Sequence, residues 1–179
     1  IAGFRVYRIP LIRGWRRWNA VVYGLGGIAL LVWLRRRYDL IHAHQLHTSG
    51  LIASFVHHLL RTKRTIVKNA TGGTHGDVRH LQRMLTGRSV DVFARCVDQF
   101  IGVSEETVAE MHVAHLAPAV LVPNGVDTIA FHHPSADVRE RMQRRIGVHD
   151  DRRLVLLFVG RLHPKKDVQT IIDACGMLT

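Results

Sequence analysis

Short apolar segments alternate with longer segments of helical character along most of the chain. The apolar segments are rich in Val, Ile and Leu, and turn residues follow them. Near-continuous apolar strands separated by helices are typical of parallel sheets that helices cover on both faces. The pattern therefore predicts an α/β fold with Rossmann-like parallel sheets. The predicted strands are 39–44, 65–68, 99–103, 119–122 and 153–159, and the predicted helices are 20–34, 49–60, 77–97, 138–146, 166–177 and one that begins at Glu105.

In such sheets ligands bind at the carboxyl ends of the strands, so the residues that follow each strand are candidates for a site. A polar, charged stretch over residues 132–152 predicts a linker between two sheets. We therefore expect a first domain over residues 1–131 and the start of a second over residues 153–179. The residues that follow the predicted strands include His42, His44, Gly72, Gly73, Ser104, Asn124, Gly125, Gly160 and Arg161.

The chain is strongly basic, with 25 Lys and Arg residues against 14 Asp and Glu residues and a formal charge of +11. Such an excess favours an anionic partner, which can be a nucleic acid, an anionic lipid or a phosphorylated small molecule. Arginines and tryptophans flank the apolar segment 20–34. This arrangement fits a helix at a membrane interface, and a solvated basic rim explains the same residues equally well. The segment is shorter than the roughly twenty residues that a bilayer span needs.

Other kinds of site find less support in the sequence. A zinc site needs three or four convergent ligands, and the nearby His42, His44 and His47 have no cysteine or carboxylate pattern beside them. A nucleic-acid-binding domain would explain the charge, but no motif of such a domain is present, so no nucleic-acid partner is expected. Cys96 and Cys175 lie far apart without a CxxC motif, which favours a reducing, cytoplasmic compartment.

The predicted strand 153–159 ends at Gly160, which Arg161 follows at once, and Lys166 lies at the start of the next predicted helix. A guanidinium fork and an ammonium group both suit phosphate oxygens, and a helix N-terminus adds partial positive charge. Together they would hold a diphosphate and offset the charge that builds on it as a leaving group. A surface arginine and a solvated helix start explain the same residue types.

The run Val122-Pro-Asn-Gly-Val-Asp127 with Phe131, followed by Leu157-Phe-Val-Gly-Arg-Leu162 and Lys166, resembles the retaining glycosyltransferases of family 4. Residues 39–44 and 100–104 are also similar to the first domain of that family. The resemblance implies an incomplete GT-B glycosyltransferase, with an acceptor-binding Rossmann-like domain followed by a donor-binding one. It implies transfer of a sugar from a nucleotide-diphosphate sugar to a sugar, a lipid-linked or another hydroxyl acceptor, with retention and without a metal or other cofactor.

By match to the family motifs, Arg161 and Lys166 are the expected catalytic contacts to the donor diphosphate. Gly160, Asn124 and Gly125 are expected on the donor side as well. The expected acceptor-side cleft contains His44, Gly72, Gly73 and Ser104.

The stretch from Lys68 to Gly73 stands where many members carry a histidine, and the late Glu-x7-Glu motif of the family is not found. We therefore expect the 179-residue piece to be inactive by itself. The expected location is the cytoplasm, peripherally on the inner face of a membrane. The alternatives are a truncated remnant, or a basic nucleic-acid- or membrane-binding domain without catalysis.

Overall fold

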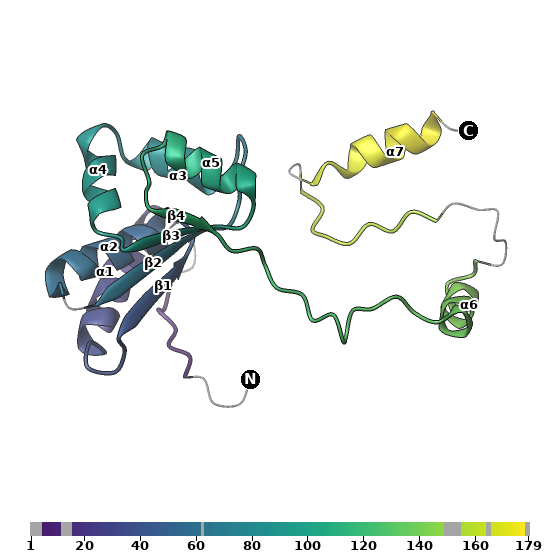
Figure 1. Cartoon of the computed structure of the whole chain (residues 1–179), viewed down its shortest axis with the longest axis horizontal. Helices are drawn as coiled ribbons and strands as arrows, with labels where there is room; N and C mark the ends of the chain where they lie inside the picture. The colour runs from purple at the N-terminus through teal and green to yellow at the C-terminus, as the bar shows by residue number, and fades with distance from the viewer. Residues whose placement is uncertain (1–4, 12–15, 62, 149–154, 164–165, 178–179) are drawn as a thin grey trace. The chain divides into compact units, whose positions relative to one another are not determined.

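The computed structural model of the chain describes residues 5–11, 16–61, 63–148, 155–163 and 166–177. It divides into two compact units, Ile1–Asn124 and Gly125–Thr179. Figure 1 shows the first unit as a sheet with helices packed around it, and in the second unit it labels two helices, with residues 155–163 drawn as extended chain. Each unit is described by itself.

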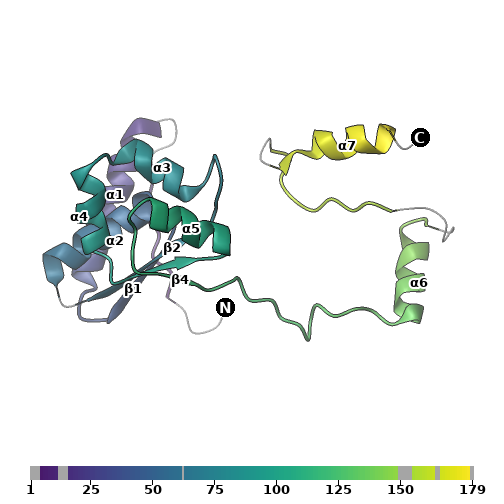
Figure 2. The ribbon, with the colours of Figure 1, turned by 45° about the horizontal axis from the view of Figure 1, so that its top comes forward.

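The described residues of the first unit form a sheet of four parallel strands in the order β1-β2-β3-β4, all labelled in Figure 1, and Figure 2 shows the same sheet from another side. The strands are Leu40–His44 (β1), Arg64–Asn69 (β2), Gln99–Gly102 (β3) and Ala119–Leu121 (β4). Helices connect each strand to the next, as a parallel sheet requires. They are Thr48–Leu60 (α2), Asp77–Met84 (α3), Arg88–Arg95 (α4) and Glu105–Val113 (α5), and Arg16–Trp33 (α1) precedes the sheet. The prediction of a Rossmann-like α/β fold is confirmed.

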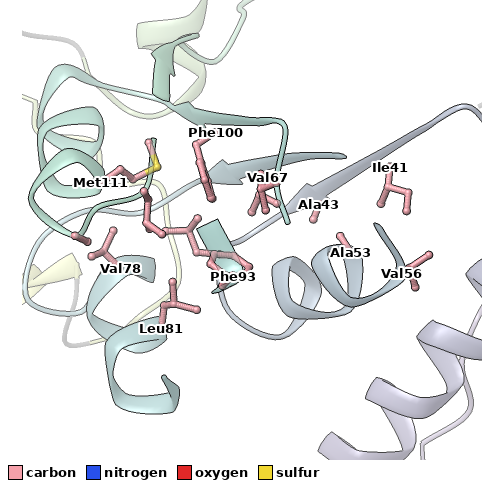
Figure 3. Close-up of a cluster of buried hydrophobic side chains, with 14 residues drawn as sticks. Ile41, Ala43, Ala53, Val56, Val67, Val78, Leu81, Phe93, Phe100 and Met111 are labelled. Atoms are coloured by element: carbon pink, nitrogen blue, oxygen red, sulfur yellow. The ribbon is translucent and has the colours of Figure 1, made fainter. Parts of the chain in front are cut away.

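The hydrophobic core lies between the sheet and its helices. Figure 3 shows Ile41, Ala43, Val67 and Phe100 directed to the same side of the strands, with Ala53 and Val56 of α2 facing them. The alternate residues of β1, namely Leu40, His42 and His44, are exposed. The expectation that both faces of the strands are buried is therefore wrong for β1 among the described residues. One face of this strand packs on the core, and the other presents polar and apolar side chains to solvent.

One predicted helix differs from the structure, another begins where the sequence predicts, and both results have identifiable reasons. The predicted helix 77–97 is divided into α3 and α4, because the chain turns at Gly87 with a φ of 53°, which favours glycine. The helix α5 begins where expected, because the Ser104 hydroxyl accepts a hydrogen bond from the Thr107 N–H and Thr107 caps in return.

The second unit contains the helices Ala136–Arg145 (α6) and Val168–Gly176 (α7). Residues 155–159, the described part of the predicted strand 153–159, form no strand, although all five are apolar. Leu157 and Val159 are 85% and 84% exposed. A strand exists only as part of a hydrogen-bonded ladder, and no described segment pairs with this one. The prediction of a strand is wrong for these residues.

Candidate functional site

The carboxyl end of the sheet brings several polar side chains together on its exposed face. His44 ends β1, and the parallel register places it opposite Lys68 of β2. The rings of His42 and His44 stack with their centroids 4.5 Å apart. Burial lowers the pKa of His42, and the neighbouring His44 and Lys68 lower it further. His42 therefore favours its neutral form, in which one ring nitrogen can accept a hydrogen bond.

Lys68 joins this pair of histidines to the segment that follows β4. Its Nζ donates a hydrogen bond of 2.7 Å to Oδ1 of Asn124. Asn124 thus lies at the same end of the sheet as His44, as the sequence predicts from strand order. We call His42, His44, Lys68 and Asn124 the strand-end cluster. It combines one fixed cation, two imidazoles and one amide, so it can donate hydrogen bonds to phosphate or hydroxyl oxygens.

The glycine loop after β2 lies beside α5 and is held by two carboxylates. The backbone N–H of Gly73 donates to Oε1 of Glu110 at 2.6 Å. Asp77, at the start of α3, accepts the Ala70 N–H at 3.0 Å and the Thr71 hydroxyl at 2.8 Å. The loop therefore has a fixed conformation with negative charge behind it.

This arrangement changes the expected role of the glycines. The sequence places Gly72 and Gly73 in the expected acceptor-side cleft, but the backbone N–H of Gly73 already donates a hydrogen bond to Glu110. A side chain on Gly72 would approach Thr107 to 3.2 Å and the Glu110 carboxylate to 3.5 Å, so this glycine allows the loop to pack on α5. The carboxylates of Glu110 and Asp77 disfavour an anion here, whereas a neutral hydroxyl remains compatible.

Ser104 and His47 also lie where strands end. The Ser104 hydroxyl is engaged in the cap of α5, so its observed role is structural. His47 precedes α2, and its ring meets that of His80 edge-on with centroids 4.8 Å apart. Burial lowers the pKa of His47, the Asp77 carboxylate raises it, and His80 lowers it further. The net result is a histidine that favours its neutral form.

The predicted donor elements all lie in the second unit, apart from Asn124. Arg161 and Lys166 are exposed, and the Lys166 N–H donates to the His163 carbonyl at 2.8 Å. A small pocket of about 230 Å³ at the start of α7 is lined by Leu162, His163, Asp167, Val168 and Gln169. The roles of Gly160, Arg161, Lys166, Asn124 and Gly125 as donor contacts remain predictions.

Two further features of the described residues bear on the kind of site. No group of three or more His, Cys, Asp or Glu side chains among them is placed to hold a metal ion. An apolar pocket of about 520 Å³ lies between α2 and α4, and none of the candidate residues lines it. It is therefore separate from the strand-end cluster.

The parallel sheet with polar residues at its carboxyl end defines a Rossmann-like domain of the kind that binds its ligands at that edge. The sequence profile of the glycosyl transferase 4-like domain matches residues 1–125, which is more than half of the 179 residues. The chain therefore belongs to this family of glycosyltransferases. The resemblance seen in the sequence motifs is confirmed. No curated protein is similar enough to the chain to count as a match.

Sequence reasoning missed three residues of this site. Lys68 is a basic residue in an otherwise largely apolar strand, and it pairs with His44 in the neighbouring strand. Because side chains alternate between the two faces of a strand, its place on the same face as His44 could have been predicted. Asp77 and Glu110 hold the glycine loop through side-chain contacts. Glu110 lies 37 positions from Gly73, and nothing in the local sequence predicts that contact.

Proposed function

We propose that the protein transfers a sugar from a nucleotide-diphosphate sugar to a hydroxyl-bearing acceptor, with retention of configuration at the transferred carbon. The observation that carries the proposal is the strand-end cluster in a domain of the glycosyl transferase 4-like family. Transfer requires groups that orient an acceptor hydroxyl and groups that neutralise the departing diphosphate. The first unit supplies candidates for the former, and the second unit carries candidates for the latter.

On the acceptor side, we assign orientation of the hydroxyl group to the strand-end cluster and the glycine loop. The Lys68 ammonium and the His44 imidazole supply hydrogen-bond donors at the end of the sheet. The carboxylates of Glu110 and Asp77 behind the loop favour an uncharged acceptor group over an anionic one. Sugars and other alcohols fit this environment, including those linked to a lipid at some distance from the reacting hydroxyl.

On the donor side, we assign the diphosphate to Arg161 and Lys166, and we assign Gly160, Asn124 and Gly125 to donor binding as well. Both cations are exposed and belong to one short segment, which supports a role in binding an anion. No metal is part of the proposal, because the two cations can offset the leaving-group charge themselves.

The location we propose is the cytoplasmic, inner face of an anionic membrane. Cys96 and Cys175 are both free, which suits a reducing compartment. The first 38 residues contain eight arginines and no acidic residue, which suits an anionic surface. None of the helices in the described parts of the chain is long and apolar enough to cross a bilayer.

The donor assignment is tested with Arg161→Ala and Lys166→Ala in the full-length protein. Each substitution should lower kcat/KM for the nucleotide sugar by about 10²-fold, because a charge-assisted contact to the leaving group contributes about 2–4 kcal/mol in the transition state. Arg141→Ala is the matched control, since it removes an exposed positive charge from α6 of the same unit. Near wild-type kcat/KM in both test variants would show that these residues do not bind the diphosphate.

A further inference from the structure

We propose that α1 lies in the plane of an anionic membrane, with one stripe of its apolar side chains inserted among the lipids. The stripe consists of Trp18, Val21, Leu25 and Trp33, and we call it the α1 stripe. This inference rests on the membrane location proposed above and is independent of the sugar-transfer reaction. It assigns the surface that makes the contact and the orientation of the helix.

The α1 stripe runs along one side of the helix. Its members are separated by three, four and eight positions, and this spacing places them on one side of an α-helix. Their exposed fractions are 61%, 49%, 64% and 65%. At 1.5 Å per residue the stripe is about 22 Å long. Large apolar side chains exposed in such a row indicate a surface that binds an apolar partner.

The opposite side of α1 holds the helix on the first unit. A side chain on Gly27 would come within 3.1 Å of Ile52 on α2, so the two helices pack closely there. Ile28 and Leu31 pack against the hydrophobic core. The stripe therefore projects away from the unit, and burying it does not require the helix to leave its place.

The charges around α1 select an anionic partner. The first 38 residues contain eight arginines and no acidic residue. The described ones that flank the stripe are Arg5, Arg8, Arg35, Arg36 and Arg37, and all five are exposed. The Arg37 guanidinium lies 5.8 Å from the centre of the Trp33 ring, which places a cation directly beside the end of the stripe. Basic side chains at this position attract anionic lipid headgroups.

The combination of these features favours a membrane surface over a protein partner. Tryptophans at both ends of an apolar stripe are typical of helices that lie at the boundary between headgroups and acyl chains. Because α1 cannot cross a bilayer, an orientation in the membrane plane is the one that buries the stripe. A second copy of the chain would bring two sets of arginines together, and their repulsion disfavours such a dimer.

The experiment measures binding of the full chain to vesicles by its intrinsic fluorescence. All three tryptophans, Trp15, Trp18 and Trp33, lie in or next to α1, so the signal reports on this region alone. Vesicles that contain phosphatidylglycerol are compared with vesicles of phosphatidylcholine only, at low salt. The wild-type chain should show a blue-shifted emission with the anionic vesicles, quenching by lipids brominated on the acyl chain, and much weaker binding to the neutral ones.

The decisive comparison is Leu25→Glu against Val113→Glu. Both substitutions replace an exposed apolar residue by an acid, but Val113 lies on α5, outside the stripe, and is 81% exposed. Leu25→Glu should weaken vesicle binding by about tenfold or more, whereas Val113→Glu should weaken it only slightly. Circular dichroism of both variants verifies that the fold is retained.

Each other outcome overturns a stated part of the inference. Equal weakening by the two substitutions would mean that charge alone drives binding and that the stripe stays outside the lipid. Sedimentation that shows a dimer broken by Leu25→Glu, with vesicle binding unchanged, would assign the stripe to a second copy instead. If the wild-type chain binds no anionic vesicle, the membrane location fails as well, while sugar transfer to a soluble acceptor is unaffected by that result.

Discussion

The two units of the chain contain apolar segments of similar kind, and among the residues that the structure describes only those of the first unit form a sheet. Residues 155–159 of the second unit are all apolar, yet they are exposed or half-buried and belong to no strand. The strand β2 of the first unit begins with Arg64 and contains Lys68, and it is nevertheless paired on both sides. The difference teaches that neighbouring strands, and not the apolar character of a segment, decide whether it becomes part of a sheet.

The same contrast applies to the candidate site residues. Those of the first unit have partners that fix their positions, as Lys68 has Asn124 and Gly73 has Glu110. Arg161 and Lys166 of the second unit are exposed. A site needs supporting contacts to hold its geometry, and the first unit already has them.

The largest expected difference between the units concerns the core. Phe100 is completely buried and lies 5.8 Å from Phe93, measured between ring centres. Phe100→Ala should lower the free energy of unfolding by about 3–5 kcal/mol, because it removes a large buried side chain and leaves a cavity. Leu157→Ala in the second unit should change it by less than about 0.5 kcal/mol, since Leu157 is 85% exposed. Urea denaturation of both variants measures the contrast, and comparable losses would contradict it.

A smaller difference is expected for glycines. A side chain on Gly102 would lie 2.5 Å from Cγ2 of Val108 and 3.0 Å from its backbone nitrogen, whereas one on Gly125 would meet no atom within 4 Å. Gly102→Ala should destabilise the first unit by about 1–3 kcal/mol, because α5 must move away from β3. Gly125→Ala should leave the stability unchanged or raise it slightly. Thermal unfolding followed by circular dichroism compares the two, and an unaffected Gly102→Ala would show that α5 packs less closely.

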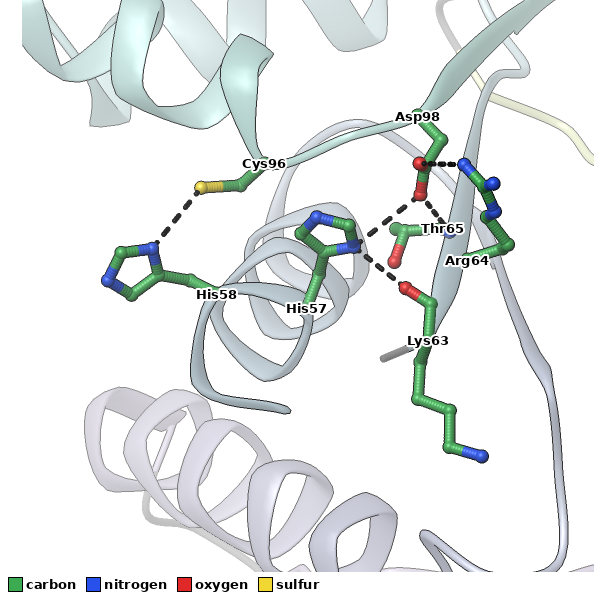
Figure 4. Close-up of polar contacts among 7 residues, drawn as sticks. All are labelled: His57, His58, Lys63, Arg64, Thr65, Cys96 and Asp98. Atoms are coloured by element: carbon green, nitrogen blue, oxygen red, sulfur yellow. Dashed lines mark hydrogen bonds and ion pairs between the residues drawn. The ribbon is translucent and has the colours of Figure 1, made fainter. Parts of the chain in front are cut away.

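The third difference concerns two aspartates whose pKa values are both lowered. Figure 4 shows Asp98 beside Arg64, His57 and Thr65. Burial acts to raise the pKa of Asp98, but the Thr65 N–H at 2.7 Å, the Arg64 guanidinium at 3.0 Å and the charge of His57 outweigh it. A carboxylate with a lowered pKa stabilises the folded state above the pKa of the unfolded chain, near 4, and this contribution is lost as the pH falls through the folded value.

Asp98→Asn should therefore lower the free energy of unfolding by about 1–2 kcal/mol at pH 7, and the difference from the wild type should shrink as the pH falls below the pKa of the unfolded chain. Asp137, at the start of α6 in the second unit, is the matched control, because its pKa is lowered chiefly by a hydrogen bond from Ser135 while the group is fully exposed. Asp137→Asn should leave the denaturation midpoint unchanged. A pH-independent loss for Asp98→Asn would show that the ionised carboxylate is not the stabilising form.

Much of the first unit can be predicted from its sequence. The strands that end at His44 and Gly102 pair with strands that are near them in the sequence, and Ser104 is the N-cap residue of the helix that follows it. The local sequence pattern and the fold therefore agree in this unit. The division between α3 and α4 at Gly87 and the contact of Glu110 with the glycine loop were not predicted, since both depend on how distant segments pack.

The prediction of a strand over residues 153–159 was wrong in its described part, because strand formation also depends on distant segments. Its composition is that of a buried strand, but a ladder partner is a property of the whole sheet and cannot be read from the segment itself. The same reasoning applies to the exposed face of β1, where composition alone suggested burial on both faces.

The central claim is that the strand-end cluster serves sugar transfer, and Lys68→Ala in the full-length protein tests it most directly. The measurement is release of nucleoside diphosphate from a panel of nucleotide sugars in the presence of hydroxyl acceptors. The wild-type protein should turn over at least one donor, and Lys68→Ala should lower kcat/KM by about 10²-fold, while Lys63→Ala, which lies directly before β2 and away from the strand-end cluster, should leave it near the wild-type value. Turnover by Lys68→Ala equal to that of the wild type, or no turnover of any nucleotide sugar by the wild type, would contradict the claim.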